Sequence, residues 1–166
     1  VTAGIDPEVN QCLTGNSFAF GNTGSTGNGE TYAWDFGDLI PGTSINEDPT
    51  YVFAVAGTFT VTQTVSSGVC NDQATINVTI NPMPLPTAFA DSVLCFGDAT
   101  GVATVNTPIG PGPGPFGFSW NTTPVQTSNP ATGLIAGTYT ATVTDQTTTC
   151  TGTIAVTVFE PVILTA

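Results

Sequence analysis

The chain is built from one ordered set of motifs that occurs twice. Each half has a cysteine, an aromatic strand with one tryptophan, Ala-Gly before a strand with threonine at every second position, a second cysteine and a closing strand. The matching positions are Cys12, Trp34 and Cys70 in the first half, and Cys95, Trp120 and Cys150 in the second. Such an internal repeat indicates two copies of one structural unit. The sequence therefore predicts an all-β chain of two similar β-sandwiches.

The threonine-rich runs 58–65 and 138–145 show the strand pattern most strictly. Alternation with period 2 places one set of side chains against a core and the other set outward. In the first run Phe59, Val61 and Val65 are expected to face the core and the threonines to face away. A hydroxyl array could suit ice only if it were flat, and sandwich sheets twist. We expect a solvated face or a packing surface instead.

The run Asn81-Pro82-Met83-Pro84-Leu85-Pro86 marks a boundary between the two halves. Three prolines at alternate positions exclude an interior strand and favour an extended connector. We predict a first unit over residues 1–81, a linker over 82–86 and a second unit over 87–161. Residues 162–166 are expected to begin a further module or to form a strand that pairs with a neighbour, so the chain is expected to be a slice of a longer one.

None of the four cysteines stands in a C-x-x-C pair, and the chain has no histidine, which argues against a zinc site. Two disulfides formed in an oxidising compartment are the better interpretation. The internal repeat selects the pairs Cys12–Cys70 and Cys95–Cys150, one within each unit. Closing loops of this length stabilises each unit by about 4 kcal/mol in the chain-entropy model.

The chain has 12 acidic residues and no Lys, Arg or His, so its formal net charge is −12. Nothing can neutralise phosphates, which excludes nucleic-acid binding and attraction to anionic membranes. No apolar run of 18 residues is present, so direct membrane insertion is not expected. Dissolved cations must balance the charge, either around a solvated acidic surface or at a specific Ca²⁺ site. No other cofactor is expected.

Asp35 and Asp38 have the spacing of a candidate acid/base pair, but they follow an aromatic strand and flank Gly37. We expect them to form the turn by accepting hydrogen bonds from backbone N–H groups. Without basic residues or a nucleophile motif, the chain is not expected to be an enzyme.

Trp34 and Trp120 could each stack on a sugar, but we expect each to be a core residue packed against the disulfide of its unit. Asn77 and Asn121 begin the N-glycosylation sequons Asn-Val-Thr and Asn-Thr-Thr. Both remain candidate modification sites.

The first half contains three short motifs: 32–38 (Tyr-Ala-Trp-Asp-Phe-Gly-Asp), Asp48-Pro49 with Tyr51 and Phe53, and 57–61 (Gly-Thr-Phe-Thr-Val). In these motifs it resembles a polycystic-kidney-disease (PKD) domain, in the cysteine-flanked variant of Bacteroidetes secreted proteins. The family usually has a glycine where this chain has Leu39.

The second half contains another ordered set of motifs: 95–98 (Cys-Phe-Gly-Asp), 118–121 (Phe-Ser-Trp-Asn), 134–139 (Leu-Ile-Ala-Gly-Thr-Tyr), 143–145 (Val-Thr-Asp) and Cys150. In these motifs it resembles the repeat of the gliding adhesin SprB from the same bacteria. The family's Gly-Gly is replaced by the Gly-Pro run at 110–115.

Together the resemblances imply immunoglobulin-like sandwiches at the cell surface, exported by the type IX route, without catalysis. Asp91-Ser92-Val93 also resembles the O-glycosylation signal of these bacteria, with Ser92 as the acceptor. The expected function is a structural or adhesive module pair in an extracellular fibre, in contact with neighbouring modules, copies of itself or surface glycans. The alternatives are a carbohydrate- or Ca²⁺-dependent binding module, or an accessory region of a secreted hydrolase.

Overall fold

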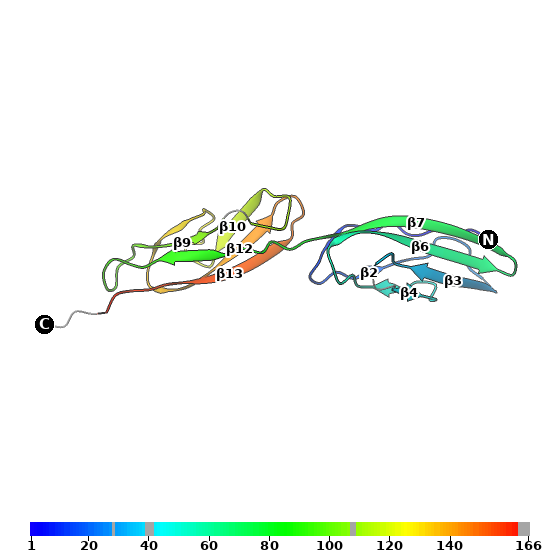
Figure 1. The fold of residues 1–166 in the computed structure, drawn as a ribbon, viewed down its shortest axis with the longest axis horizontal. Coiled ribbons are helices and arrows are strands. Elements are labelled where there is room, and N and C mark those ends of the chain that lie inside the picture. The colour runs from blue at the N-terminus through cyan, green and yellow to red at the C-terminus, as the bar shows by residue number, and fades with distance from the viewer. Residues whose placement is uncertain (28, 39–41, 107–108, 163–166) are drawn as a thin grey trace. The chain divides into compact units, whose positions relative to one another are not determined.

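The protein is all-β and divides into two compact units, Val1–Pro82 and Met83–Ala166. The computed structural model describes residues 1–27, 29–38, 42–106 and 109–162. Each unit is a β-sandwich (Figure 1). No helix among the described residues has the length and apolar character needed to span a membrane. Leu39, where the PKD family usually has a glycine, lies outside the described residues. Residues 163–166, which were expected to belong to a further module or a pairing strand, lie outside them as well.

Unit 1 packs a five-stranded sheet, in the order β1-β7-β6-β3-β4, against the pair β2-β5. Its longest element is the β6–β7 hairpin, which is paired from Gly57–Ile80 to Ser67–Cys70 (Figure 1). β1 pairs with the end of β7 in parallel, and the other pairs are antiparallel. The strands are β1 (Gln11–Cys12), β2 (Phe18–Ala19), β3 (Glu30–Asp35), β4 (Thr43–Ser44), β5 (Thr50–Tyr51), β6 (Gly57–Ser67) and β7 (Cys70–Asn81).

The core of unit 1 is mainly aromatic. Phe20 lies 5.9 Å from Trp34 and 5.4 Å from Phe36 between ring centroids. In β6, Val61 and Val65 are fully buried, whereas the threonines between and before them are exposed or half-buried, as the alternation predicted. Burial of each large apolar side chain stabilises the unit by about 1.5–3 kcal/mol.

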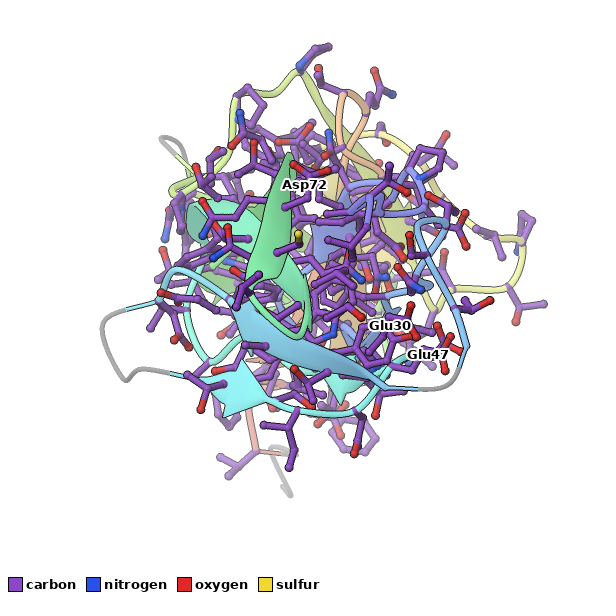
Figure 2. All side chains as sticks on the ribbon, turned by 90° about the vertical axis from the view of Figure 1, so that its right-hand side faces the viewer. Glu30, Glu47 and Asp72 are labelled. Carbon is purple, nitrogen blue, oxygen red and sulfur yellow. The ribbon has the colours of Figure 1, made fainter. Side chains whose placement is uncertain are left out.

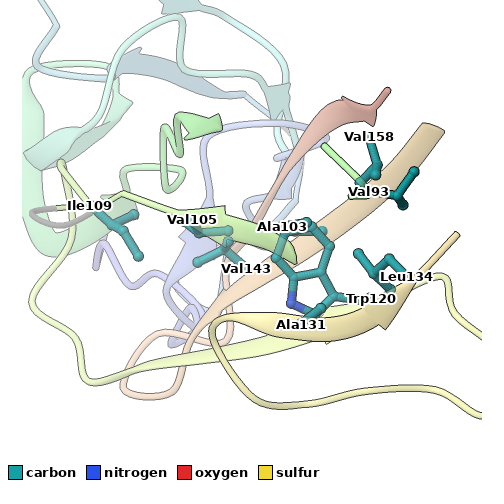
Figure 3. Packing of buried hydrophobic residues seen from close by; sticks show 10 residues of the cluster. Val93, Ala103, Val105, Ile109, Trp120, Ala131, Leu134, Val143 and Val158 are labelled. Carbon is teal, nitrogen blue, oxygen red and sulfur yellow. The ribbon is translucent and has the colours of Figure 1, made fainter. Parts of the chain in front are cut away.

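Unit 2 pairs β10-β12-β13 in one sheet and β11-β9-β8 in the other. Its core is mostly aliphatic and surrounds Trp120, which lies near Ala103, Ala131 and Leu134 (Figure 3). The strands are β8 (Ala88–Asp91), β9 (Gly101–Val105), β10 (Phe116–Trp120), β11 (Ala131–Leu134), β12 (Gly137–Asp145) and β13 (Thr151–Val158).

The first described residues make one bridge, Ile5–Asn22, and irregular backbone hydrogen bonds such as Thr23 N–H to Gly4 O (2.9 Å). The predicted linker packs more than expected, because Pro84 is buried and Leu85 N–H donates to Gly110 O (3.0 Å). Most of the proline run therefore belongs to unit 2.

Gln63 is a buried polar side chain at a core-facing position of β6. It has no exposed surface. Its Oε1 accepts a hydrogen bond from Gly4 N–H (3.1 Å), and its Nε2 donates to Asn22 Oδ1 (2.8 Å). A buried amide is tolerated when it is fully hydrogen-bonded. Gln63 thus fastens the first residues of the chain to the sheet.

Asp145 plays a similar part in unit 2, at the buried end of β12. Its carboxylate accepts hydrogen bonds from the N–H groups of Gly114 (3.1 Å), Thr147 (2.9 Å) and Thr148 (3.1 Å). Burial alone would raise the pKa of Asp145, but the hydrogen bonds from Gly114, Thr148 and Thr147 outweigh burial and lower the pKa. Asp145 thus holds the Gly-Pro loop against the β12–β13 turn.

Replacing Gln63 by leucine should lower the free energy of unfolding by about 1–3 kcal/mol, because Gly4 N–H loses its buried partner. Urea unfolding followed by circular dichroism measures the change. Gln73→Leu is the matched control, because Gln73 is exposed and, among the residues that the structure describes, its side chain bonds Thr64 at the surface. This variant should stay within about 0.5 kcal/mol of the wild type. Equal effects of the two variants would contradict the role given to Gln63.

Replacing Asp145 by asparagine should destabilise the protein at pH 7. The asparagine amide has an NH₂ group in place of one carboxylate oxygen, and this donor would face the backbone N–H donors that the carboxylate accepts from. The pKa of Asp145 is lower in the folded chain than its unfolded value of about 3.9. The stability it confers is therefore complete above about pH 4 and is lost as pH falls through the folded-state pKa. Urea midpoints of wild type and variant should converge in acid. Asp91→Asn, at an exposed position of the same unit, should show no such convergence, and a constant Asp145 difference down to pH 3 would refute the assignment.

Candidate functional site at the ends of the two units

The chain enters and leaves unit 1 at opposite ends of its long strands. The chain starts beside the first residues of β7, where Ala3 N–H donates to Asp72 (2.9 Å). β7 then runs for 12 residues to Asn81, where the linker begins. We call the end of unit 1 that holds Cys70 its distal end, and the end that holds Cys12 and Asn81 its linker end.

Unit 2 has the same arrangement. The chain enters beside the start of β13. The backbone oxygen of Pro84 lies so close to Gly152 that a Cβ at this glycine would collide with it. It leaves after β13 at Phe159, whose carbonyl accepts a hydrogen bond from Val93 N–H (2.9 Å). We call the Pro84 end the linker end of unit 2 and the Phe159 end its distal end.

The prediction of one disulfide within each unit is wrong for both pairs, Cys12–Cys70 and Cys95–Cys150. Cys70 and Cys95 are free thiols, and both are exposed. Cys12 and Cys150 are the disulfide-bonded cysteines.

Strand length explains why the predicted pairs do not form. Cys12 lies opposite Asn81 in the sheet, and Cys70 is the first residue of the same 12-residue strand. At about 3.3 Å per residue the two positions are roughly 36 Å apart, whereas bridged Cα atoms lie within about 7 Å. Cys95 and Cys150 are likewise at opposite ends of β13. The repeat identified equivalent residues correctly but gave no information on which end of a strand each one occupies.

Trp34 and Trp120 are core residues, with relative exposures of 2% and 1%. The described residues of the hydrophobic cluster around each indole include no cysteine. The expected packing of each tryptophan against a disulfide is therefore not observed. Each indole N–H donates to a carbonyl, Trp34 to Asn46 O (2.9 Å) and Trp120 to Ser128 O (3.0 Å). Burial leaves neither ring face available to stack on a sugar.

Asp35 and Asp38 organise the turn after β3. Asp35 accepts a hydrogen bond from Gly37 N–H (2.9 Å), and Asp38 accepts from Gly42 N–H (3.0 Å) and from the Tyr51 hydroxyl (2.5 Å). Burial, and then the hydrogen bond to Asp38, raise the pKa of Tyr51 to about 12. Both carboxylates are thus committed to local partners, an arrangement suited to holding a turn.

Glu30 and Glu47 both lie near Tyr32 at the distal end of unit 1, and Figure 2 labels them together with Asp72, which lies apart from them. Burial, and then the neighbouring Glu47, raise the pKa of Tyr32. The Tyr32 hydroxyl donates to Ser25 O (3.2 Å). Among the described residues, no group of three or more acidic, cysteine or histidine side chains is placed to hold a metal ion. A Ca²⁺ site therefore stays a prediction.

An open hollow of about 400 Å³ on unit 2 has the mixed lining expected of a sugar site, with Asn121, Gln126 and Tyr139 around it. Its amides already have backbone partners, however. Asn121 Oδ1 accepts from Thr140 N–H (2.8 Å), and the Gln126 amide bonds Thr132 N–H and O (3.0 and 2.9 Å). Few polar groups of the hollow are left to recognise a ligand.

The threonine faces and the candidate glycosylation sites are at the surface. Thr58 bonds Thr79 (3.1 Å) and Thr60 bonds Asn77 (2.8 Å) across β6 and β7. Asn77, Asn121 and Ser92 are exposed, as a modified residue must be. Their modification stays a prediction.

An apolar cleft at the distal end of unit 2 was not predicted from the sequence. It has a volume of about 340 Å³ and is lined by Leu94, Cys95, Phe96, Pro161 and Val162. The sequence signal for the cleft was the apolar pair Leu94 and Phe96 that flanks Cys95. This signal was missed because Cys95 was expected to form a disulfide within its unit.

Comparison with known proteins supports the two-sandwich fold. Residues 1–80 match the family model of the PKD domain. No curated protein matches the chain.

Among solved structures, extracellular domains 3–5 of Drosophila OTK align with a TM-score of 0.51 at 8% identity, over 96% of this chain and 62% of that one. Three N-terminal domains of the bacteriophage RB49 outer capsid protein Hoc align with a TM-score of 0.43 at 17% identity, over 96% and 59%. The chain thus spans about 60% of the length of these two structures.

At such low identity the likeness to the OTK domains concerns the fold alone. The family match confirms the PKD resemblance for the first half of the chain. Residues 1–80 are thus similar to the PKD domain family, within a chain of two immunoglobulin-like β-sandwiches.

Proposed function

We propose that the chain is a structural and adhesive module pair of a large extracellular cell-surface fibre, without catalytic activity. The observation that carries the proposal is that the chain enters each unit at one end and leaves at the opposite end. A load applied through the chain therefore passes along the strands of each unit.

The pairing of the first and last strands of unit 1 suits such a load. β1 and β7 are parallel, and Leu13 N–H also donates to Asn81 O (2.9 Å). Pulling from the two chain ends draws these strands in opposite directions along their length. All hydrogen bonds between them are then loaded together, which resists force better than breaking them one at a time.

The surface and the family match support an extracellular role. The described residues present turn-forming carboxylates and hydroxyl rows, and PKD domains are modules of extracellular proteins. We infer that unit 2 is an SprB-type adhesin repeat and that export follows the type IX route. Its partners are neighbouring modules, further copies and surface glycans, with O-glycosylation at Ser92.

Immunogold electron microscopy of intact producing cells, with an antibody to this chain, tests the proposal. Gold should follow surface fibres at a regular spacing and should disappear when the type IX export machinery is deleted. Label found only after cells are permeabilised would contradict the proposal. Label that co-purifies with a secreted hydrolase would favour the accessory-region alternative, and glycan- or Ca²⁺-dependent binding by the isolated chain would favour the binding-module alternative.

A further inference from the structure

We propose that the apolar cleft at the distal end of unit 2 binds the tip of the β6–β7 hairpin of a second copy of this chain. A disulfide between Cys95 of one copy and Cys70 of the other closes the contact. This inference rests on the proposed fibre function, and it names the partner and the residues that join successive copies.

The cleft exposes three large apolar side chains around one hollow. Relative exposures are 79% for Leu94, 53% for Phe96 and 85% for Val162, and the three side chains lie around one hollow with Cys95 and Pro161. Contiguous exposed apolar groups mark interaction sites in soluble proteins.

Hydrogen bonds hold the cleft walls in place. Asp98 N–H donates to Cys95 O (3.1 Å), which closes a turn. Gly97 N–H donates to the Glu160 carboxylate (3.2 Å), which ties that turn to the segment after β13. A preformed cleft loses little entropy on binding.

The hairpin tip has the matching shape and chemistry. Ser67 and Cys70 form the last pair of the hairpin, and the two-residue turn between them is Gly68-Val69, with Gly68 in the left-handed region (φ 59°). Val69 is 102% exposed, so its side chain contacts nothing in its own unit. The tip therefore presents one projecting apolar side chain next to one free thiol.

The two surfaces are different, and they sit on different units. A contact between unlike surfaces leaves one of each free, so further copies can add, and an open chain results where the rotation between copies does not close a ring. Both surfaces have acidic neighbours, Asp72 near the tip and Asp98 and Glu160 at the cleft. Salt should therefore strengthen the contact by screening this repulsion.

Bond formation needs an oxidant, for which a small disulfide such as glutathione disulfide suffices. The thiolate of Cys95 attacks the oxidant and releases one reduced thiol. The thiolate of Cys70 from the second copy then attacks the mixed disulfide and releases the other. Two protein thiols lose two protons and two electrons, and one disulfide oxidant becomes two thiols.

The test uses the full chain with glutathione disulfide, analysed on non-reducing gels. The wild type should form a ladder of covalent oligomers that grows with added salt. Cys70→Ser and Cys95→Ser should each stay monomeric alone, whereas their mixture should give dimers and nothing larger. Because the chain has no Lys or Arg, cleavage before aspartates with mass spectrometry should identify the Cys70–Cys95 cross-link.

A second variant separates docking from simple thiol reactivity. Val69→Ser should slow oligomer formation roughly tenfold, through lost apolar burial, while a small thiol reagent still labels both free cysteines at the wild-type rate. Val9→Ser is the matched control, because Val9 is 74% exposed elsewhere on unit 1. Dimers of either single cysteine variant, no ladder, or equal rates for Val69→Ser and wild type would each overturn the inference. A missing ladder with fibre labelling intact would refute this contact and leave the proposed function standing.

Discussion

Each unit depends on one long β-hairpin whose side chains alternate between the core and the outer face. In unit 1 the β6–β7 ladder spans eleven residue pairs, from Gly57–Ile80 to Ser67–Cys70. In unit 2 the β12–β13 ladder runs from Gly137–Val158 to Thr144–Thr151. Each ladder fixes which side chains enter the core. It also sets the length of the unit, and hence which residues can meet at each end.

The lack of basic residues shapes how buried polar groups are satisfied. No Lys or Arg is available to compensate a buried carboxylate. Asp145 is stabilised by three backbone N–H donors, and Gln63 uses a neutral amide to bind Gly4 and Asn22. These hydrogen bonds are insensitive to salt in a way that ion pairs are not, which suits a protein whose surface charge is all of one sign.

Local patterns made much of the fold predictable. The alternation in 58–65 and 138–145 identified the central strands, and the motif around Trp34 pointed to the PKD family model that residues 1–80 match. Gln63 and Asp145 stand at core-facing positions of those strands, so the parity of the alternation could have revealed them. The disulfides could not be predicted, because the repeat equates residues in sequence, whereas bridging depends on which end of a strand each cysteine occupies. The apolar cleft joins residues 94–96 to residues 161–162, a juxtaposition that only the fold creates.

In the proposed fibre, each unit bears load along its strands between its opposite ends. Single-molecule force spectroscopy on the full chain tests it most directly, with reductant present so that no disulfide limits extension. Pulling from the two chain ends should give two sharp unfolding events, each releasing about 80 residues or roughly 260 Å of chain. Handles at residues 12 and 82, both at the linker end of unit 1, should peel β1 from β7 at a lower force. Gradual extension without sharp events, or equal forces in the two geometries, would contradict the account.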